Sequence, residues 1–302
     1  MQGYGHQAYA ASFSSSGTPR LLPRSNGWIL ERPINGFPYS DAMGCYPLFV
    51  CEDWSQLDAD LAQVGKHLVC LSLVTDPFGE WNKENLQQWF PELVIPFKQH
   101  FVIDLSRAPE TFITSHHRRN VRKALQDVRV EECADPVSFL DDWMVLYQTL
   151  VKRHTVTGMA AFSKESLAGQ LRVPGTVAFR ALRDDATVGM LLWYEQGDRA
   201  YYHLGAHNAR GYELGSSFAL FDYSIRYFAD NGFKWLNLGA AAGAEPGEES
   251  GLTRFKQGWA TGTLTAYFCG RVFDGEKYEE IVRAQHTPPT GYFPAYRAGE
   301  FS

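Results

Sequence analysis

The chain has 302 residues, of which 45% are hydrophobic and 21% are charged, and its formal net charge is −6. These proportions are those of a folded globular protein that is long enough for one large core or two medium ones. The negative balance excludes a global electrostatic attraction to nucleic acid or to an anionic membrane.

The five cysteines are scattered, and no two of them have the spacing of a metal or redox motif. Reduced and buried thiols are therefore expected, in a cytoplasmic protein without a metal site. No apolar run approaches the ~18 residues of a membrane span. The first residues also lack the charged-then-apolar order of a signal peptide.

Residues 1–25 are rich in Gly, Ala, Ser and Tyr without any period, which predicts a flexible segment. Ordered structure is expected to begin with a strand at 28–33. A helix at 54–65, a nearly all-apolar strand at 68–74 and a further strand at 101–105 follow. This alternation predicts a first α/β unit.

Residues 109–127 predict a helix that concentrates positive charge in an otherwise acidic chain. Arg118 and Arg122 are four residues apart, as are Arg119 and Lys123, so they form two adjacent basic rows. Such a helix is suited to the phosphates of a nucleotide or of a tRNA acceptor stem. A solvated or inter-domain helix face explains the pattern equally well, and both interpretations stay open.

The following part predicts three antiparallel strands, at 177–182, 188–195 and 199–206, with turn residues between them. A helix beginning near 215–217 and a short strand at 234–238 complete a strand–helix–strand unit, which favours parallel pairing. Free N–H groups at such a helix start attract phosphate or a developing oxyanion. On the residues alone, a simple turn with a serine cap is the favoured interpretation.

Four runs stand in a fixed order in this part: YYHLG from 201, GSS from 215, NLG from 237 and FK from 255. Together they resemble the catalytic domain of the Fem-type (FemAB-like) peptidyltransferases, a branch of the GCN5-related N-acetyltransferase (GNAT) superfamily. The resemblance extends upstream to about Gly36. It implies an α/β fold (an α+β mixed sheet) with tandem GNAT-like domains, of which the second is catalytic.

After the flexible segment at 1–25, the resemblance implies a first domain at 26–115 and a catalytic domain at 116–302. The donor is expected in a gap between two diverging strands, where an amine attacks the acyl carbonyl. The implied donor-binding residues are Gly205, Asn208, Arg210, Gly211, Gly215, Ser216, Ser217, Asn237 and Phe255. The implied acceptor-binding residues are Tyr39, Tyr46, Arg119 and Arg122.

The candidate catalytic residues are Lys256, His203 and Tyr202. Strand alternation puts Tyr202 with Leu204 on one face and His203 with Gly205 on the other, so Tyr202 and His203 cannot both face the gap. His203 is either a base or a packing residue. The resemblance implies that Lys256 borders the transfer site, where it would stabilise a carbonyl oxygen or hold a phosphate. Local sequence alone would make it a surface lysine.

Two departures from the family pattern bear on the donor and the acceptor. Cys45 stands where the loop around Tyr39 and Tyr46 is expected to have a glycine. Residues 210–216, RGYELGS, depart from the Arg/Gln-x-x-Gly-x-Gly/Ala run that grips the pyrophosphate of coenzyme A. The second departure puts a coenzyme A donor in doubt. There is also no long helical hairpin of the kind that cell-wall members carry.

Three functions remain open. The first is an N-acyltransferase that uses an aminoacyl-tRNA donor and an amine acceptor, as in peptidoglycan bridge or peptide natural-product formation. The second uses acyl-CoA or an acyl-carrier thioester. The third is a non-catalytic binding module. No tightly bound cofactor is expected; the co-substrate would be aminoacyl-tRNA or acyl-CoA, and the partners tRNA and a small-molecule or peptide amine.

Overall fold

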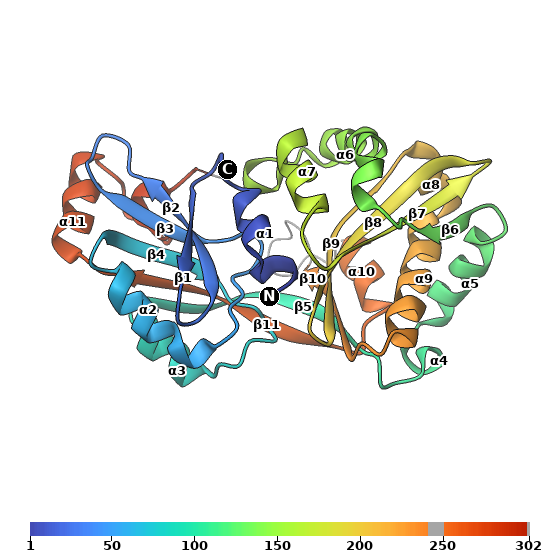
Figure 1. Ribbon diagram of the computed structural model, residues 1–302, viewed down its shortest axis with the longest axis horizontal. Helices are drawn as coiled ribbons and strands as arrows, with labels where there is room; N and C mark the ends of the chain where they lie inside the picture. Colours follow the sequence, from blue (N-terminus) through green and yellow to red (C-terminus); the bar gives the residue numbers. More distant parts are fainter. Residues whose placement is uncertain (241–250, 301–302) are drawn as a thin grey trace.

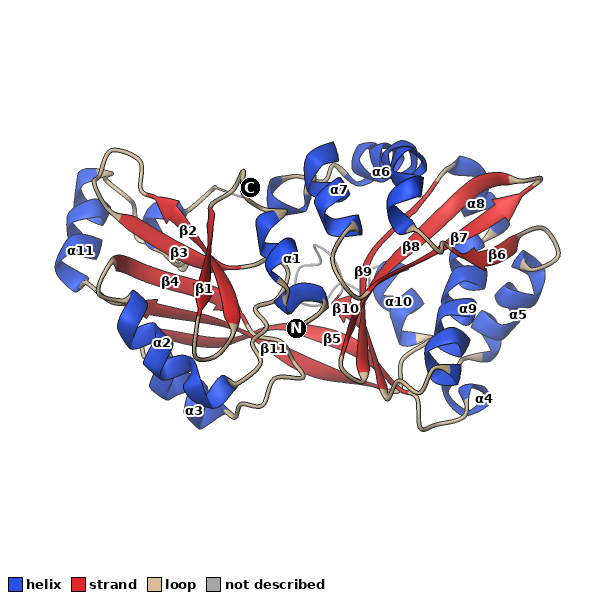
Figure 2. Ribbon diagram, in the orientation of Figure 1, coloured by secondary structure: helices blue, strands red, loops and turns tan. Residues whose placement is uncertain are grey.

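The structure is a computed structural model that describes residues 1–240 and 251–300. A single mixed sheet of eleven strands runs through it, in the order β1-β2-β3-β4-β11-β5-β10-β9-β8-β7-β6. The two long strands β5 (Leu93–Asp104) and β11 (Gly262–Val272) bridge an N-terminal and a C-terminal half, as Figure 2 shows. The mixed α/β class is therefore confirmed, with one sheet shared by both halves.

The N-terminal half has helices on both faces of its strands (Figure 1). Its remaining strands are β1 (Thr18–Leu22), β2 (Gly27–Pro33), β3 (Ser40–Gly44) and β4 (Leu68–Val74). Its helices are α2 (Leu57–Val64), α3 (Lys83–Trp89) and α11 (Gly275–Ala284). Leu57, Leu61 and Leu86 of α2 and α3 pack in one core cluster, and Ile281 of α11 packs in another. β4 is buried along almost its whole length, because elements cover it on both faces.

The C-terminal half packs α9 and α5 on one face of its strands and α6 and α7 on the other (Figure 1). Its strands are β6 (Arg129–Glu132), β7 (Thr176–Arg183), β8 (Ala186–Gln196), β9 (Arg199–His207) and β10 (Trp235–Ala240). Its helices are α4 (Pro109–Phe112), α5 (Ser115–Ala124), α6 (Leu140–His154), α7 (Lys164–Leu171), α8 (Ala209–Leu214), α9 (Ser216–Asp230) and α10 (Gly251–Gln257).

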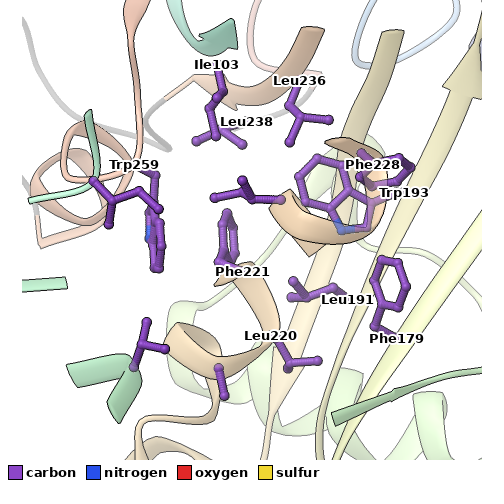
Figure 3. Close-up of a cluster of buried hydrophobic side chains, with 14 of the residues drawn as sticks. Ile103, Phe179, Leu191, Trp193, Leu220, Phe221, Phe228, Leu236, Leu238 and Trp259 are labelled. Carbon is purple, nitrogen blue, oxygen red and sulfur yellow. The ribbon is translucent and has the colours of Figure 1, made fainter. Parts of the chain in front are cut away.

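The largest core cluster lies between β8, β10 and α9 (Figure 3). Phe221 and Phe228, which lie on one apolar stripe of α9, face Trp193 of β8, and Trp259 closes the other side. Burial of these large rings is the main source of stability for this half. All five cysteines are free and buried, as expected. Within the described residues, no helix is both long and apolar enough to cross a membrane.

The expectation of a flexible segment at 1–25 is wrong. The turn at Gly3–Gly5 and helix α1 (Gln7–Ala11) lie between the two halves (Figure 1). Tyr4, Tyr9 and Phe13 are buried there, and the amide of Gly3 donates to the carbonyl of Pro174 at 2.9 Å. Small residues alternating with aromatic ones gave no helical or strand period, but the aromatic rings supply enough apolar surface to fix the segment.

The predicted boundary between a first domain at 26–115 and a second at 116–302 also needs correction. β11 pairs with β4 and β5, and α11 packs against β4, so the last 40 or so residues return to the N-terminal half. Arg297 anchors this return, since its guanidinium bonds both carboxylate oxygens of Asp41 in β3. Pairing between distant segments, which no local pattern encodes, decides this arrangement.

Candidate functional site

The parallel strands β9 and β10 separate at their carboxyl ends. They pair over three positions, from Trp235 opposite Arg199 to Asn237 opposite Tyr201. Beyond that point β9 stays with β8 as far as His207, whereas β10 stays with β5 on its other side. Because each strand follows its own neighbour, the two strands are no longer paired beyond this point, as the resemblance implies, and the place between their carboxyl ends is called the gap below. Carboxyl ends of parallel strands are where ligands bind in open α/β sheets.

A β-bulge in β9 changes which side chains face this gap. The register with β8 shifts by one residue between Tyr202 and Leu204, which leaves His203 as the extra residue. Tyr202 packs towards α9, but Leu204 packs in the cluster of α6 on the opposite face. The predicted alternation, with Tyr202 and Leu204 on one face, is therefore wrong. Gly205 joins the side of Tyr202 instead: a Cβ there would lie 2.2 Å from the tyrosine hydroxyl.

His203 faces α7 and the N-terminal segment, away from Tyr202. Its Nε2 lies 2.9 Å from Oε1 of Gln170 and its Nδ1 3.1 Å from the hydroxyl of Tyr4. Since an amide oxygen only accepts, Nε2 carries the proton and Nδ1 accepts from Tyr4. Burial lowers the pKa of His203 to about 3. With both nitrogens engaged and so low a pKa, this ring is suited to packing and not to general-base catalysis.

Lys256 of α10 lies at the gap and is only 5% exposed, which excludes the surface-lysine interpretation. Its Nζ donates to the carbonyl of Ala240, at the end of β10, over 2.6 Å. The same Nζ is 5.7 Å from the centre of the Tyr202 ring. Gly239 has a φ of +73°, and a Cβ on it would come within 3.3 Å of Nζ. A left-handed glycine thus gives the lysine room beside the strand end.

Burial lowers the pKa of Lys256 to about 7, and the charge of nearby Lys98 adds to the effect. Among the residues that the structure describes, no carboxylate pairs with this lysine. The neighbouring histidine, His100, lies 3.0 Å through Nδ1 from Oδ1 of Asn237, and its pKa falls to about 4 for the same reason. Within the described residues the site therefore has basic side chains and no carboxylate, which suits a group that develops negative charge.

Asn237 and Phe255, two of the predicted donor-binding residues, lie beside Lys256 and His100. Oδ1 of Asn237 accepts from the amide of Gly239 at 2.8 Å, which shapes the end of β10. The ring of Phe255 packs against Phe221 and Phe218, with centroids 5.0 and 5.2 Å apart. Sequence reasoning missed His100, because a single histidine at the start of an apolar strand gives no signal of the residues beside it.

The other predicted donor residues bond among themselves around the start of α9. Asn208 caps α8 by accepting from the amide of Gly211 at 2.8 Å. The hydroxyl of Ser216 is buried and lies 2.8 Å from Nδ1 of His207. A Cβ on Gly211 would lie 2.1 Å from the carbonyl oxygen of Val188. Helix α8 thus contains most of the run 210–216 that departs from the pyrophosphate-gripping pattern.

Three further donor candidates lie in the same turn. Arg210 forms an exposed ion pair with Glu213, Gly215 joins α8 to α9 with a φ of +65°, and Ser217 is half-buried in the first turn of α9. The glycine makes a left-handed turn between the two helices, but the expected serine cap is wrong, because Gly215 itself is the N-cap of α9 and no side chain caps this helix. The contacts of Arg210 and the backbone turn at Gly215 stabilise the local fold.

The four predicted acceptor residues do not come together. Tyr39 bonds Glu280 of α11 at the far end of the N-terminal half, and α5 lies at the opposite end of the molecule (Figure 1). Arg119 and Arg122 are exposed on α5. Tyr46, which is 37% exposed, packs against Phe162 between the two halves. Of the four, only Tyr46 is in the central region.

Comparisons with known proteins agree with this fold. Residues 114–257 match the family described as acetyltransferase (GNAT) domain. The crystal structure of FemX has a TM-score of 0.66 at 13% identity, over 91% of this chain and 93% of that one. The C-terminal domain of a putative lysylphosphatidylglycerol synthetase from Agrobacterium fabrum has a TM-score of 0.65 at 14% identity, over 98% and 95%.

A third structure, L-PGS from Bacillus licheniformis, has a TM-score of 0.59 at 13% identity and covers 90% of this chain and 93% of its own. Comparison with curated protein sequences finds no match. The fold is therefore shared over almost the whole chain, while the sequences have diverged widely.

Proposed function

We propose that this chain, a GNAT-type acyltransferase with the fold of the Fem-type branch, transfers an aminoacyl group from an aminoacyl-tRNA-type donor to an amine acceptor. The observation that carries the proposal is Lys256, a buried lysine without a described counter-charge at the point where β9 and β10 separate. A buried cation of this kind is unfavourable for folding alone, and perturbed groups of this kind cluster at functional sites.

The gap supplies what amide formation needs. The acceptor nitrogen attacks the acyl carbon, the carbon–nitrogen bond forms and the bond from that carbon to the donor oxygen breaks. Negative charge develops on the carbonyl oxygen, and Nζ of Lys256 is placed to stabilise it. The proton that the amine loses balances the one that the leaving oxygen gains. Burial raises the pKa of Tyr202, so that its hydroxyl remains a hydrogen-bond donor.

Two features favour a tRNA-type donor over coenzyme A. Helix α8 contains most of the run that departs from the pyrophosphate-gripping pattern, and its Gly211 packs against Val188 and not against open space. The exposed face of α5 carries Arg119, Arg122 and Lys123, which suits a polyanion. One structural neighbour is named for lysylphosphatidylglycerol, a product that contains an aminoacyl group, and this is in line with an aminoacyl donor.

Donor discrimination tests the proposal. Purified protein is offered a set of charged tRNAs or of acyl-CoAs together with an amine acceptor, and product mass and thermal shift are measured. Product formation with charged tRNA that ribonuclease abolishes is the expected result. Product from acyl-CoA that is insensitive to ribonuclease would overturn the tRNA donor in favour of acyl-CoA. Binding of donors without any product would favour the binding module.

A lysine substitution then tests the site itself. Lys256→Ala is expected to lower kcat about 100- to 1000-fold, as loss of one oxyanion-stabilising group does. The matched control is Lys234→Ala, which removes an exposed lysine paired with Asp198 and is expected to keep full activity. Unchanged turnover in Lys256→Ala would place the chemistry elsewhere.

A further inference from the structure

We propose that His117 of α5 is a positioning residue that fixes α10, and with it Lys256, at the transfer site. The inference rests on the proposed function only for what Lys256 does there. The positioning itself follows from contacts between two helices that are far apart in the sequence.

Helix α10 needs such support because it is short. It has seven residues, of which Lys256 is the only buried one and Phe255 is half-buried. A helix of this length is not stable by its own backbone hydrogen bonds. Its orientation must therefore come from the elements that it contacts, and the direction of the lysine side chain depends on that orientation.

His117 supplies a hydrogen bond that the helix lacks. The last carbonyls of a helix have no partner within it. The amide of Trp259 donates to Lys256 O at 3.1 Å and not to Phe255 O, four residues back. Nε2 of His117 donates to Phe255 O at 2.9 Å. The histidine thus bonds the carbonyl that directly precedes Lys256.

Thr114 sets the orientation of the imidazole. Because a carbonyl only accepts, Nε2 of His117 carries the proton, and Nδ1 accepts from the hydroxyl of Thr114 at 2.9 Å. The backbone amide of Thr114 also donates to Gly258 O at 3.1 Å. The first turn of α5 therefore bonds the end of α10 at two carbonyls, Phe255 O and Gly258 O, which together fix the rotation of the helix about its axis.

Steric contact completes the arrangement. A Cβ on Gly258 would lie 2.0 Å from Cε1 of His117, so the ring lies directly on the glycine backbone. The ring also packs edge-on against Trp259, with centroids 4.9 Å apart, and the same tryptophan closes the core cluster in Figure 3. No side chain at 258 would permit this approach. The ring of His117 thus holds the end of α10 by steric contact as well as by its hydrogen bond.

The test compares two substitutions of His117. His117→Leu keeps much of the volume and removes the hydrogen bond, whereas the amide of His117→Gln can still donate to Phe255 O. We expect kcat to fall ten- to hundred-fold in His117→Leu with KM values within about threefold of wild type, because a small misplacement of a reacting group has effects of this size. His117→Gln is expected to stay within about threefold. His67→Leu, a change at an exposed histidine of the N-terminal half, is the control.

A second readout does not depend on activity. Protein labelled with 13C at lysine Cε is titrated by NMR, and the Lys256 resonance is assigned with Lys256→Met. The pKa of Lys256 is expected to rise from about 7 towards the ordinary 10.5 in His117→Leu and to stay low in His117→Gln. Lys98 and His100, which face Lys256, are unchanged in both variants.

The outcomes separate the two proposals. A wild-type lysine titration in His117→Leu, or identical behaviour of His117→Leu and His117→Gln, would overturn the positioning role. A shifted titration in a protein that transfers no acyl group from any donor would leave the positioning role standing and reject the proposed function. If His117→Leu does not fold, Thr114→Ala takes its place, and an unshifted Lys256 titration there overturns the proposal.

Discussion

Each half of the sheet contains one pair of parallel strands joined by a helix, and the two pairs behave differently. In the N-terminal half, β3 and β4 pair from Ser40 to Met43, and a further bridge joins Phe49 to Thr75 beyond the strand end. In the C-terminal half, β9 and β10 separate after Tyr201. The same strand–helix–strand order therefore yields one closed pair and one open pair, and the candidate site lies beside the open pair.

The two halves also differ in whether their buried charged residues have partners of opposite charge. Asp41 in β3 is fully buried, and Arg297 bonds both of its oxygens while Arg32 lies 3.4 Å away. Lys256, also buried, has Lys98 and His100 as its charged or titratable neighbours within the described residues. A buried charge with its counter-charges holds a structure together, whereas one without them is available to a ligand.

The largest effect on stability is expected from a substitution of Asp41, which is paired with Arg297 and Arg32. Asp41→Ala removes the buried carboxylate shared by Arg32 and Arg297 and leaves them, among the described carboxylates, only the exposed Glu300. We expect a loss of about 3–5 kcal/mol in the free energy of unfolding, measured by urea denaturation. The control is Asp58→Ala, which removes the half-exposed partner of Arg271 and is expected to lose less than about 1 kcal/mol. Equal midpoints for the two variants would show that the Asp41 cluster does not stabilise the fold.

Lys256, which has no carboxylate partner among the described residues, predicts a change of opposite sign in the free energy of unfolding. The folded state holds the pKa of Lys256 at about 7, whereas the unfolded chain has the ordinary 10.5, so the unfolded state binds more protons between these values. Lys256 therefore lowers stability at neutral pH, and this penalty disappears as the pH rises through 10.5. Lys256→Met is expected to be more stable than wild type by at most about 4 kcal/mol at pH 7, with a difference that shrinks at higher pH.

Urea denaturation at several pH values from 7 to 10 measures this difference. Lys234→Met, at an exposed position, is expected to follow wild type at every pH. A constant or negative difference for Lys256→Met would mean that the lysine has a counter-charge, and the contrast with Asp41 would then be lost.

Local patterns predicted the C-terminal half better than the N-terminal one, and the reason is the range of the interactions. The apolar stripe of α9 and the turn residues between β7, β8 and β9 act within a few residues, so the meander and helix are confirmed. The order of the family runs then placed Lys256 at the gap. The burial of Lys256 could not be predicted from the residues next to it, because Nζ bonds the carbonyl of Ala240, which is 16 residues away in the sequence.

Long-range contacts explain what sequence reasoning missed. The sequence around Tyr39 does not indicate where this residue lies relative to the sheet. Its position is set by α11, which returns to the N-terminal half and bonds Tyr39 through Glu280. Tyr4 and Tyr9 are buried only because β8 and β9 present aromatic rings to them. The bulge at His203 follows from the register with β8, so strand alternation alone assigned Leu204 to the wrong face.

A smaller effect on stability is expected from a substitution of Gly205, which lies beside Tyr202. Gly205→Ala places a methyl group within 2.2 Å of the hydroxyl of Tyr202 and 2.7 Å of Leu191 Cδ2, so that the tyrosine must move. We expect a destabilisation of about 1–3 kcal/mol, as overpacking usually gives, and a lower kcat. The double variant with Tyr202→Phe is expected to recover part of the stability, because the hydroxyl makes the closest contact. No recovery would show that Leu191, and not Tyr202, sets the limit.

The smallest effect concerns the opposite face of β9, where the N-terminal segment packs. Tyr4→Phe keeps the ring against Tyr194 but removes the hydroxyl that bonds His203, which is expected to lose about 1 kcal/mol and about 2 °C in Tm. Because His203 has a pKa of about 3 and faces away from Tyr202, kcat and its pH profile are expected to stay unchanged. Tyr292→Phe, at a 39% exposed position, is the control for hydroxyl removal. A displaced pH profile in Tyr4→Phe would return His203 to the role of general base, and the reactive face of β9 would then be the one that α7 covers.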